Sequence, residues 1–149
     1  MAENCTLGKV MISEEQIRQR VKELGKQITE DYKGKEVLFI GILRGAVLFM
    51  SDLIREVDLD ARIDFMAVTS YGASTKSPGV VRILKDLDSD IEGMDVIIVE
   101  DIVDSGTTLH YLRDYLLGRK PKSLKICAFL DKPERREADI RADYIGFEV

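Results

Sequence analysis

The sequence has few of the residues on which disulfide-rich, zinc-binding and nucleophile-using proteins depend. It contains two cysteines, Cys5 and Cys127, one histidine, His110, and no tryptophan. Two cysteines so far apart argue against a disulfide framework and a zinc site, and they favour a reducing compartment. One histidine without a paired cysteine also argues against a Ser-His-Asp triad or a Cys/His nucleophile. We interpret His110 as a structural or solvated residue.

The sequence also lacks a basic surplus and a long apolar run. Its formal net charge is -5 at pH 7, which argues weakly against a nucleic-acid partner without excluding a local basic patch. No segment approaches the ~20 apolar residues of a membrane span, and the first residues show no signal peptide. We therefore expect a cytoplasmic protein with no nucleic-acid and no membrane partner.

What the chain does contain is a regular alternation of helical and strand patterns. Its 149 residues are 45% apolar and 33% charged, which predicts one soluble globular domain over 1–149. Helices are expected at 13–32, 45–57 and 107–117, and strands at 36–43, 61–69, 80–85, 95–99, 124–130 and 144–149. Apolar strands that alternate with helices predict an α/β fold with a mostly parallel twisted sheet flanked by helices.

The stretch VIIVEDIVDSGTTL, residues 96–109, combines a buried strand with acids and hydroxyls. Ser105, Gly106, Thr107 and Thr108 come between the strand and a helix start, where backbone N–H groups lack internal partners and the helix dipole is positive. Together they could form a cradle for a phosphate monoester. Taken alone, the same loop would be better interpreted as an ordinary capped helix start, which occurs in most α/β proteins.

The acids in this stretch favour a ligand. Glu100 and Asp101 crowd two negative charges at the end of the strand, which is unfavourable without a cation or hydroxyl partners. Ribose hydroxyls and Mg²⁺ are their natural partners. Asp104 adds a third acid beside the cradle. A phosphate site next to a diol site predicts a phosphorylated ribose as ligand.

These residues carry a resemblance that extends over essentially the whole chain. Residues 96–109 resemble the signature of the type I phosphoribosyltransferases, in particular hypoxanthine-guanine phosphoribosyltransferases of the bacterial type. The resemblance implies that family's Rossmann-like fold and an Mg²⁺-dependent purine salvage enzyme. Its partners would be 5-phosphoribosyl-1-pyrophosphate, a 6-oxopurine base (hypoxanthine or guanine), IMP or GMP, and pyrophosphate. It also implies a homodimer or homotetramer.

The resemblance implies roles for single residues. Asp104 would be the general base that takes a proton from the purine, and Lys132 would contact the purine's exocyclic oxygen. Arg44 and Gly45 match the pyrophosphate loop, with a cis peptide before Arg44. Arg136 matches a position associated with pyrophosphate. The carboxylates Glu100 and Asp101 would hold the ribose diol and Mg²⁺, directly or through water, and the amides of Ser105, Gly106, Thr107 and Thr108 would hold the 5-phosphate.

Simpler interpretations stand beside these roles. The Arg44 segment is also typical of a surface turn, and Ser70 and Tyr71, which resemble the start of a mobile active-site loop, are also typical of any exposed loop. The segment KPERREADIRAD is typical of a solvated charged turn. We prefer the functional role for Lys132 and leave that of Arg136 open.

The resemblance also shows a departure. Family members continue past the position of Val149 into a hood segment that completes the purine site, and we expect this segment to be absent here. Three other functions stay open: a regulator of the same fold that binds RNA, a phosphoacceptor receiver domain, and a nucleotide-binding module without catalysis. The preference among hypoxanthine, guanine and xanthine is also open.

Overall fold

A six-stranded sheet forms the centre of the molecule. The computed structural model describes residues 11–70 and 81–149. The strand order is β3-β2-β1-β4-β5-β6, and only β3 runs antiparallel to its neighbour. The strands are β1 (Glu36–Leu43), β2 (Asp60–Ser70), β3 (Val81–Lys85), β4 (Asp95–Val103), β5 (Ser123–Asp131) and β6 (Tyr144–Glu148). The predicted α/β class with a mostly parallel sheet is confirmed.

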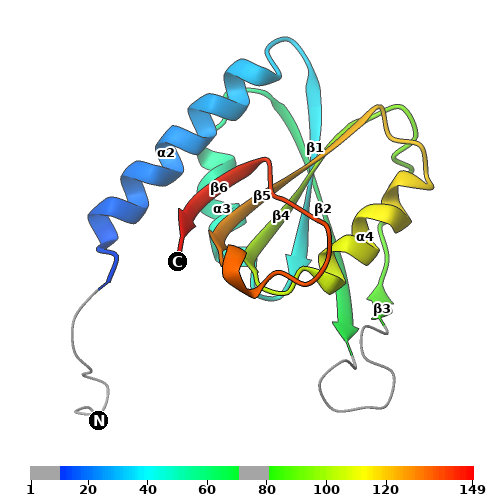
Figure 1. Ribbon diagram of the computed structural model, residues 1–149. Helices are drawn as coiled ribbons and strands as arrows, with labels where there is room; N and C mark the ends of the chain where they lie inside the picture. Colours follow the sequence, from blue (N-terminus) through cyan, green and yellow to red (C-terminus); the bar gives the residue numbers. More distant parts are fainter. Residues whose placement is uncertain (1–10, 71–80) are drawn as a thin grey trace.

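Helices cover both faces of this sheet (Figure 1). Helices α2 (Glu14–Asp31) and α3 (Val47–Arg55) pack on one face, and α4 (Thr107–Leu117) packs on the other. Each helix buries apolar residues at helical spacing; in α4 these are Leu109, Leu112 and Leu116. Buried strand residues divide between the two cores, as expected for a sheet covered on both sides.

The helix boundaries follow local chemistry. Ser13 caps α2, accepting a hydrogen bond from the Gln16 amide at 3.1 Å, while the Gln16 side chain accepts one from the Ser13 amide at 2.8 Å. This reciprocal pair is the predicted capping box. Helix α4 spans the predicted residues. Helix α3 begins at Val47 rather than at position 45, because residues 44–46 form a turn after β1.

Strand β4 differs from its prediction in a way that matters for function. We expected it to end at Val99, with the acids in the following loop. Instead β4 continues to Val103, because its ladder with β5 runs on through Glu100–Ala128 and Val103–Asp131. Glu100 and Asp101 therefore lie near the carboxyl end of a paired strand, and their side chains point to alternate sides of it.

A short 3₁₀ helix, η1 (Pro133–Arg135), follows β5 and was not predicted. It opens the long β5–β6 connection, residues 132–143, which returns from the carboxyl end of β5 to the start of the parallel strand β6. Of the loop expected after β2, residues 71–80, including Tyr71, lie outside the described residues, and Ser70 ends β2 opposite Val81. None of the helices in the described ranges combines the length and apolar character that crossing a bilayer takes.

Candidate active site

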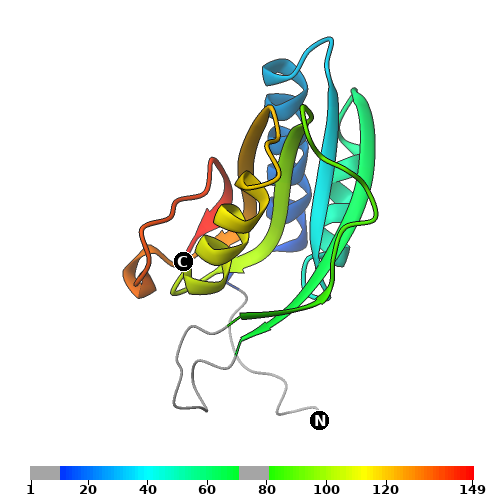
Figure 2. The same ribbon diagram turned by 90° about the vertical axis from the view of Figure 1, so that its right-hand side faces the viewer.

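The predicted site residues gather where the sheet changes direction of winding. The chain passes from β1 through α3 to β2 on one side, and from β4 through α4 to β5 on the other, so β1 and β4 are adjacent strands whose helices leave on opposite faces (Figure 2). In open α/β sheets the carboxyl edge at such a switch point is where ligands bind. Two loops meet there: the β1–α3 loop, residues 44–46, and the β4–α4 loop, residues 104–106.

The β4–α4 loop presents the amino end of α4 to a cleft. Gly106 precedes the helix with φ +84°, in the left-handed region that favours glycine, and no side chain caps α4. The Ser105 hydroxyl lies 3.2 Å from the Thr107 hydroxyl and 3.3 Å from the Thr107 amide. Glu100, Asp104, Ser105 and Thr108 line this cleft together. Backbone amides, hydroxyls and carboxylates therefore face one space.

The two carboxylates of β4 have different surroundings. Glu100 lines the cleft, whereas Asp101 lies against the β1–α3 loop: a Cβ on Gly45 would be 2.4 Å from its Oδ2. Burial, and next the neighbouring Asp101 carboxylate, raises the pKa of Glu100 to about 8. The crowding expected from the sequence is therefore present, and a cation or a polyol at this position would relieve it.

Asp104 is the third acid of the site. Its side chain is 45% exposed, but its Oδ1 atom is buried and accepts no hydrogen bond from the described residues. The closest charged group is the Arg135 guanidinium, whose Nε lies 3.3 Å from Oδ1 as an ion pair without hydrogen-bond geometry. A carboxylate with one unsatisfied oxygen can accept a proton or a hydrogen bond from a ligand.

The β1–α3 loop has the predicted backbone. The Leu43–Arg44 peptide is cis, which confirms the expectation from the resemblance. Arg44 is exposed, and Gly45, which has no side chain, lies so close to Asp101 that a Cβ there would require the carboxylate or the loop to shift. Apart from the packing of Gly45 on Asp101, the described hydrogen bonds of the loop are local, from the Ala46 amide to Ile42 and from the Val47 amide to Arg44.

The acidic side chains of the site suit Mg²⁺ better than a metal ion whose ligands all come from the protein. Among residues 11–70 and 81–149, no group of three or more His, Cys, Asp or Glu is arranged to hold a metal ion. Two adjacent carboxylates, Glu100 and Asp101, are present. Magnesium commonly takes one or two carboxylates and completes its octahedron with water and substrate oxygens. Either carboxylate therefore suits a magnesium ion that arrives with an oxygen-rich ligand, although the two face different spaces.

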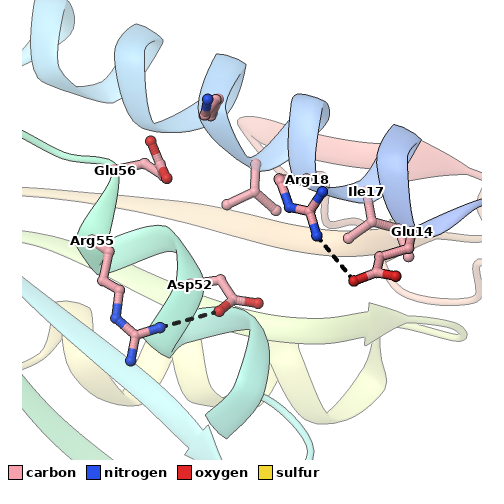
Figure 3. Close-up of a pocket in the computed structure, with 8 residues that line it drawn as sticks. Glu14, Ile17, Arg18, Asp52, Arg55 and Glu56 are labelled. Atoms are coloured by element: carbon pink, nitrogen blue, oxygen red, sulfur yellow. Dashed lines mark hydrogen bonds and ion pairs between the residues drawn. The ribbon is translucent and has the colours of Figure 1, made fainter.

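A second hollow, between α2 and α3, has no comparable chemistry. Four of its charged side chains are paired with one another: Arg18 with Glu14 at 2.9 Å and Arg55 with Asp52 at 3.6 Å (Figure 3). Figure 3 shows these pairs along the two helices, with Glu56 at the far end. None of its lining residues belongs to the two loops at the carboxyl edge.

Known proteins share both this sequence and this fold. A family model described as the phosphoribosyl transferase domain matches residues 11–149. The chain is 55% identical over 143 residues to a hypoxanthine-guanine phosphoribosyltransferase of Bacillus subtilis, covering 96% of this chain and 79% of that protein. It is 53% identical over 142 residues to a hypoxanthine phosphoribosyltransferase of Salmonella typhimurium, covering 94% and 80%. The chain belongs to the phosphoribosyltransferase family.

The solved structures agree with this family membership. The crystal structure of a hypoxanthine phosphoribosyltransferase from Staphylococcus aureus matches with a TM-score of 0.94 at 48% identity, covering 100% of this chain and 81% of that one. At this level of sequence identity the likeness extends beyond the fold. The type I phosphoribosyltransferase fold expected from residues 96–109 is therefore confirmed for this phosphoribosyltransferase.

Two basic residues predicted for the site of this phosphoribosyltransferase differ in their surroundings. Lys132 is half-buried at the end of β5; its amide donates to Val103 at 2.9 Å, and no bond to its ammonium group is found in the described part of the chain. Arg136 has a side chain only 16% exposed, and its three guanidinium nitrogens bond to Asp104, Ile140 and Asp131. The pyrophosphate role of Arg136 stays a prediction.

Sequence reasoning missed two residues beside the site. Arg135 was treated as part of a charged turn, and Asp131 as the end of a strand. The structure places Arg135 against Asp104 and buries Asp131 at 4% exposure as the partner of Arg136. For the Asp131–Arg136 pair, the sequence offers one signal: a single acid ends the apolar strand just before KPERR. This signal does not indicate which of the two arginines is buried.

Proposed function

We propose that the chain transfers a phosphoribosyl group from 5-phosphoribosyl-1-pyrophosphate to hypoxanthine or guanine, giving IMP or GMP and releasing pyrophosphate in purine salvage. One observation carries the proposal: the uncapped amino end of α4 shares a cleft with Glu100 and Asp104 at the switch point of the sheet. Anion-binding amides beside carboxylates are complementary to a sugar phosphate. The family's close relatives support the same reaction by their names.

The phosphoribosyl end would lie on the β4–α4 loop. The amides and hydroxyls of Ser105, Gly106, Thr107 and Thr108 would donate to the 5-phosphate, assisted by the positive end of the helix dipole. The carboxylate of Glu100, which lines the same cleft, would accept hydrogen bonds from the ribose hydroxyls. Binding of this kind orients C1 of the ribose toward the purine.

Magnesium fits the Glu100 and Asp101 pair, directly or through water, and when bound it would neutralise charge on pyrophosphate oxygens. Gly45 lies against Asp101, so the β1–α3 loop adjoins this position. The backbone of Gly45 and the exposed guanidinium of Arg44 would then hold the departing pyrophosphate. The transition state of such a glycosyl transfer resembles an oxocarbenium ion, so stabilising the leaving group is a main task of the site.

Two side chains would handle the purine. Asp104 would accept the proton from N7 as N9 attacks C1, a general-base role for which its unsatisfied Oδ1 is suited. Lys132 would donate to O6 of a 6-oxopurine and disfavour adenine, whose amino group at that position cannot accept. The loop that begins at Ser70 and Tyr71 would exclude water from the reacting sugar.

The remaining expectations belong to the same proposal. We expect a homodimer or homotetramer in the cytoplasm, a single phosphoribosyltransferase domain over 1–149, and no nucleic-acid or membrane partner. The relatives' names support an enzyme rather than a binding module, an RNA-binding regulator or a receiver domain. Light scattering of the purified chain tests the oligomer: a monomer at all concentrations would contradict it.

A product assay tests the reaction. The chain is incubated with 5-phosphoribosyl-1-pyrophosphate, Mg²⁺ and each purine in turn, and nucleotides are separated by chromatography. We expect IMP or GMP and no AMP, and no product when Mg²⁺ is chelated. Thermal unfolding with the same ligands is measured alongside. If there is neither product nor a ligand-dependent rise in the unfolding temperature, the proposed function is wrong.

A further inference from the structure

The β4–α4 loop is supported from behind by the β5–β6 connection. The amides of Glu137 and Ala138 donate to the Ser105 carbonyl at 2.8 and 3.1 Å. A Cβ at Gly106 would lie 2.6 Å from Cγ2 of Ile140 and 2.9 Å from Cδ of Arg136. The loop that would hold the phosphate therefore rests directly on residues 136–140, and its shape depends on theirs.

Arg136 is the side chain that joins these two segments. Its Nε donates to the Asp104 carbonyl at 3.2 Å, its Nη1 donates to the Ile140 carbonyl at 2.7 Å, and its Nη2 bonds to the Asp131 carboxylate. Each guanidinium nitrogen is bonded within the protein and the side chain is only 16% exposed, so moving Arg136 toward a ligand would break these bonds.

The carboxylate of Asp131 allows the charged side chain of Arg136 to be buried behind the β4–α4 loop. Its carboxylate is 4% exposed and pairs with Arg136, so each buried charge neutralises the other. Losing one partner would leave the other charged and buried, which is strongly unfavourable. A lysine could neutralise Asp131, but it has no planar fork with which to reach Asp104 and Ile140 at the same time.

From these contacts we infer that Arg136 is a positioning residue: paired with Asp131, it fixes the Asp104 peptide and so aims the amides of the β4–α4 loop at the 5-phosphate. This inference rests on the proposed function, since it takes that loop as the phosphate site. It replaces the direct pyrophosphate contact suggested by the resemblance with an indirect role. Small displacements of such a loop weaken binding by roughly 10- to 100-fold.

Three ligands distinguish the indirect role from the direct one. Ribose 5-phosphate carries the 5-phosphate without pyrophosphate, magnesium pyrophosphate carries the opposite end, and 5-phosphoribosyl-1-pyrophosphate with Mg²⁺ carries both. Affinities are measured by calorimetry for the natural chain and for Arg136→Lys. We expect the variant to lose affinity for ribose 5-phosphate and for 5-phosphoribosyl-1-pyrophosphate by the same factor, roughly 10- to 100-fold, and to bind magnesium pyrophosphate unchanged.

Other outcomes would overturn the inference. Loss confined to the two pyrophosphate-bearing ligands would mean a direct contact, an equal loss for all three would mean a general structural role, and no loss would mean no role. Asp131→Asn, which should show the same ligand pattern with a smaller loss, is the second variant in case Arg136→Lys does not fold. Arg141→Ala, an exposed arginine in the same connection, is the control and should bind all three normally.

A failure of the proposed function has a different signature. If the natural chain binds neither ribose 5-phosphate nor 5-phosphoribosyl-1-pyrophosphate, the phosphate site itself is wrong, and this is seen before any variant is made. If the natural chain binds both and Arg136→Lys binds them equally well, the phosphate site stands and the positioning role of Arg136 is wrong.

Discussion

The two loops at the carboxyl edge of the sheet are held in opposite ways. The β4–α4 loop receives three hydrogen bonds from the β5–β6 connection, two at the Ser105 carbonyl and one at the Asp104 carbonyl. The β1–α3 loop has described hydrogen bonds only to its own neighbours, and Arg44 stays exposed. The site thus has one loop that is hydrogen-bonded to another segment and one loop whose described hydrogen bonds are all local.

This difference suits the proposed chemistry. The phosphoribosyl end of the substrate is present in both reactant and product, so a preorganised loop can hold it throughout. Pyrophosphate must leave, and a loop with few outside bonds can release it. Variants of each loop should therefore differ in what they disturb, and the following predictions run from the largest expected effect to the smallest.

Asp104→Asn should have the largest effect, because it removes the proposed general base and leaves the loop's backbone support in place. We expect the turnover rate to fall by about 10²- to 10⁴-fold, with the affinity for 5-phosphoribosyl-1-pyrophosphate nearly unchanged. Steady-state kinetics and calorimetry measure the two quantities. A variant that retained the full rate would show that Asp104 is not the base.

Gly106→Ala should disrupt the preorganised loop itself. The new Cβ would meet Ile140 and Arg136 at a residue whose φ is +84°, so both strain and overlap are expected. We predict a loss of ribose 5-phosphate affinity of roughly 100-fold and a free energy of unfolding lower by about 2–4 kcal/mol.

Gly34→Ala is the matched control for that variant. Gly34 has a similar φ of +79°, but a Cβ there has nothing within 4 Å. It should lower the free energy of unfolding by only about 1 kcal/mol and leave ligand affinity unchanged. Equal destabilisation in the two variants would mean that the packing of Gly106 on the β5–β6 connection contributes nothing.

Gly45→Ala tests the adaptable loop. A Cβ there would lie 2.4 Å from Oδ2 of Asp101, so either that carboxylate or the loop must move. We expect magnesium pyrophosphate to bind roughly tenfold more weakly, the scale of one lost charged contact, and ribose 5-phosphate to bind as in the natural chain. Calorimetry with both ligands checks this. The comparison between the loops fails if both affinities fall together.

Glu100→Gln should have the smallest effect, seen in ligand-free stability. The folded chain holds the Glu100 proton up to a pKa of about 8, whereas the ordinary value is 4.5. The contribution of the protonated Glu100 side chain to the free energy of unfolding is therefore complete below about pH 4.5 and is lost as pH rises through about 8. Thermal unfolding should show the variant gaining a few degrees over the natural chain near pH 9 and nothing near pH 5. A constant difference between the two across that range would contradict the raised pKa.

Much of the fold could be predicted from local patterns. The capping box of Ser13 and Gln16 and the apolar spacing of α4 are local signals, and they placed the starts of those helices correctly. The end of β4 could not be found in this way, because the strand continues only as long as β5 pairs with it. The Glu100-Asp101 dipeptide is a poor strand former by itself, and ladder pairing outweighs that local preference.

The candidate site divides in the same manner. Residues 100–108 are continuous in sequence, so the acids and the predicted phosphate loop could be proposed together from the sequence. The pairs Arg136–Asp131 and Gly45–Asp101 could not, because each joins segments that meet only after the strands have assembled.

By itself, the sequence determined the α/β class, the starts of α2 and α4 and the residue types of the β4–α4 loop, since these depend on residues a few positions apart. Only the tertiary structure decided which arginine turns inward and which face each carboxylate of β4 serves. The physical reason is that burial and charge pairing act between segments distant in the chain, and their strength is set by the space that neighbouring elements leave.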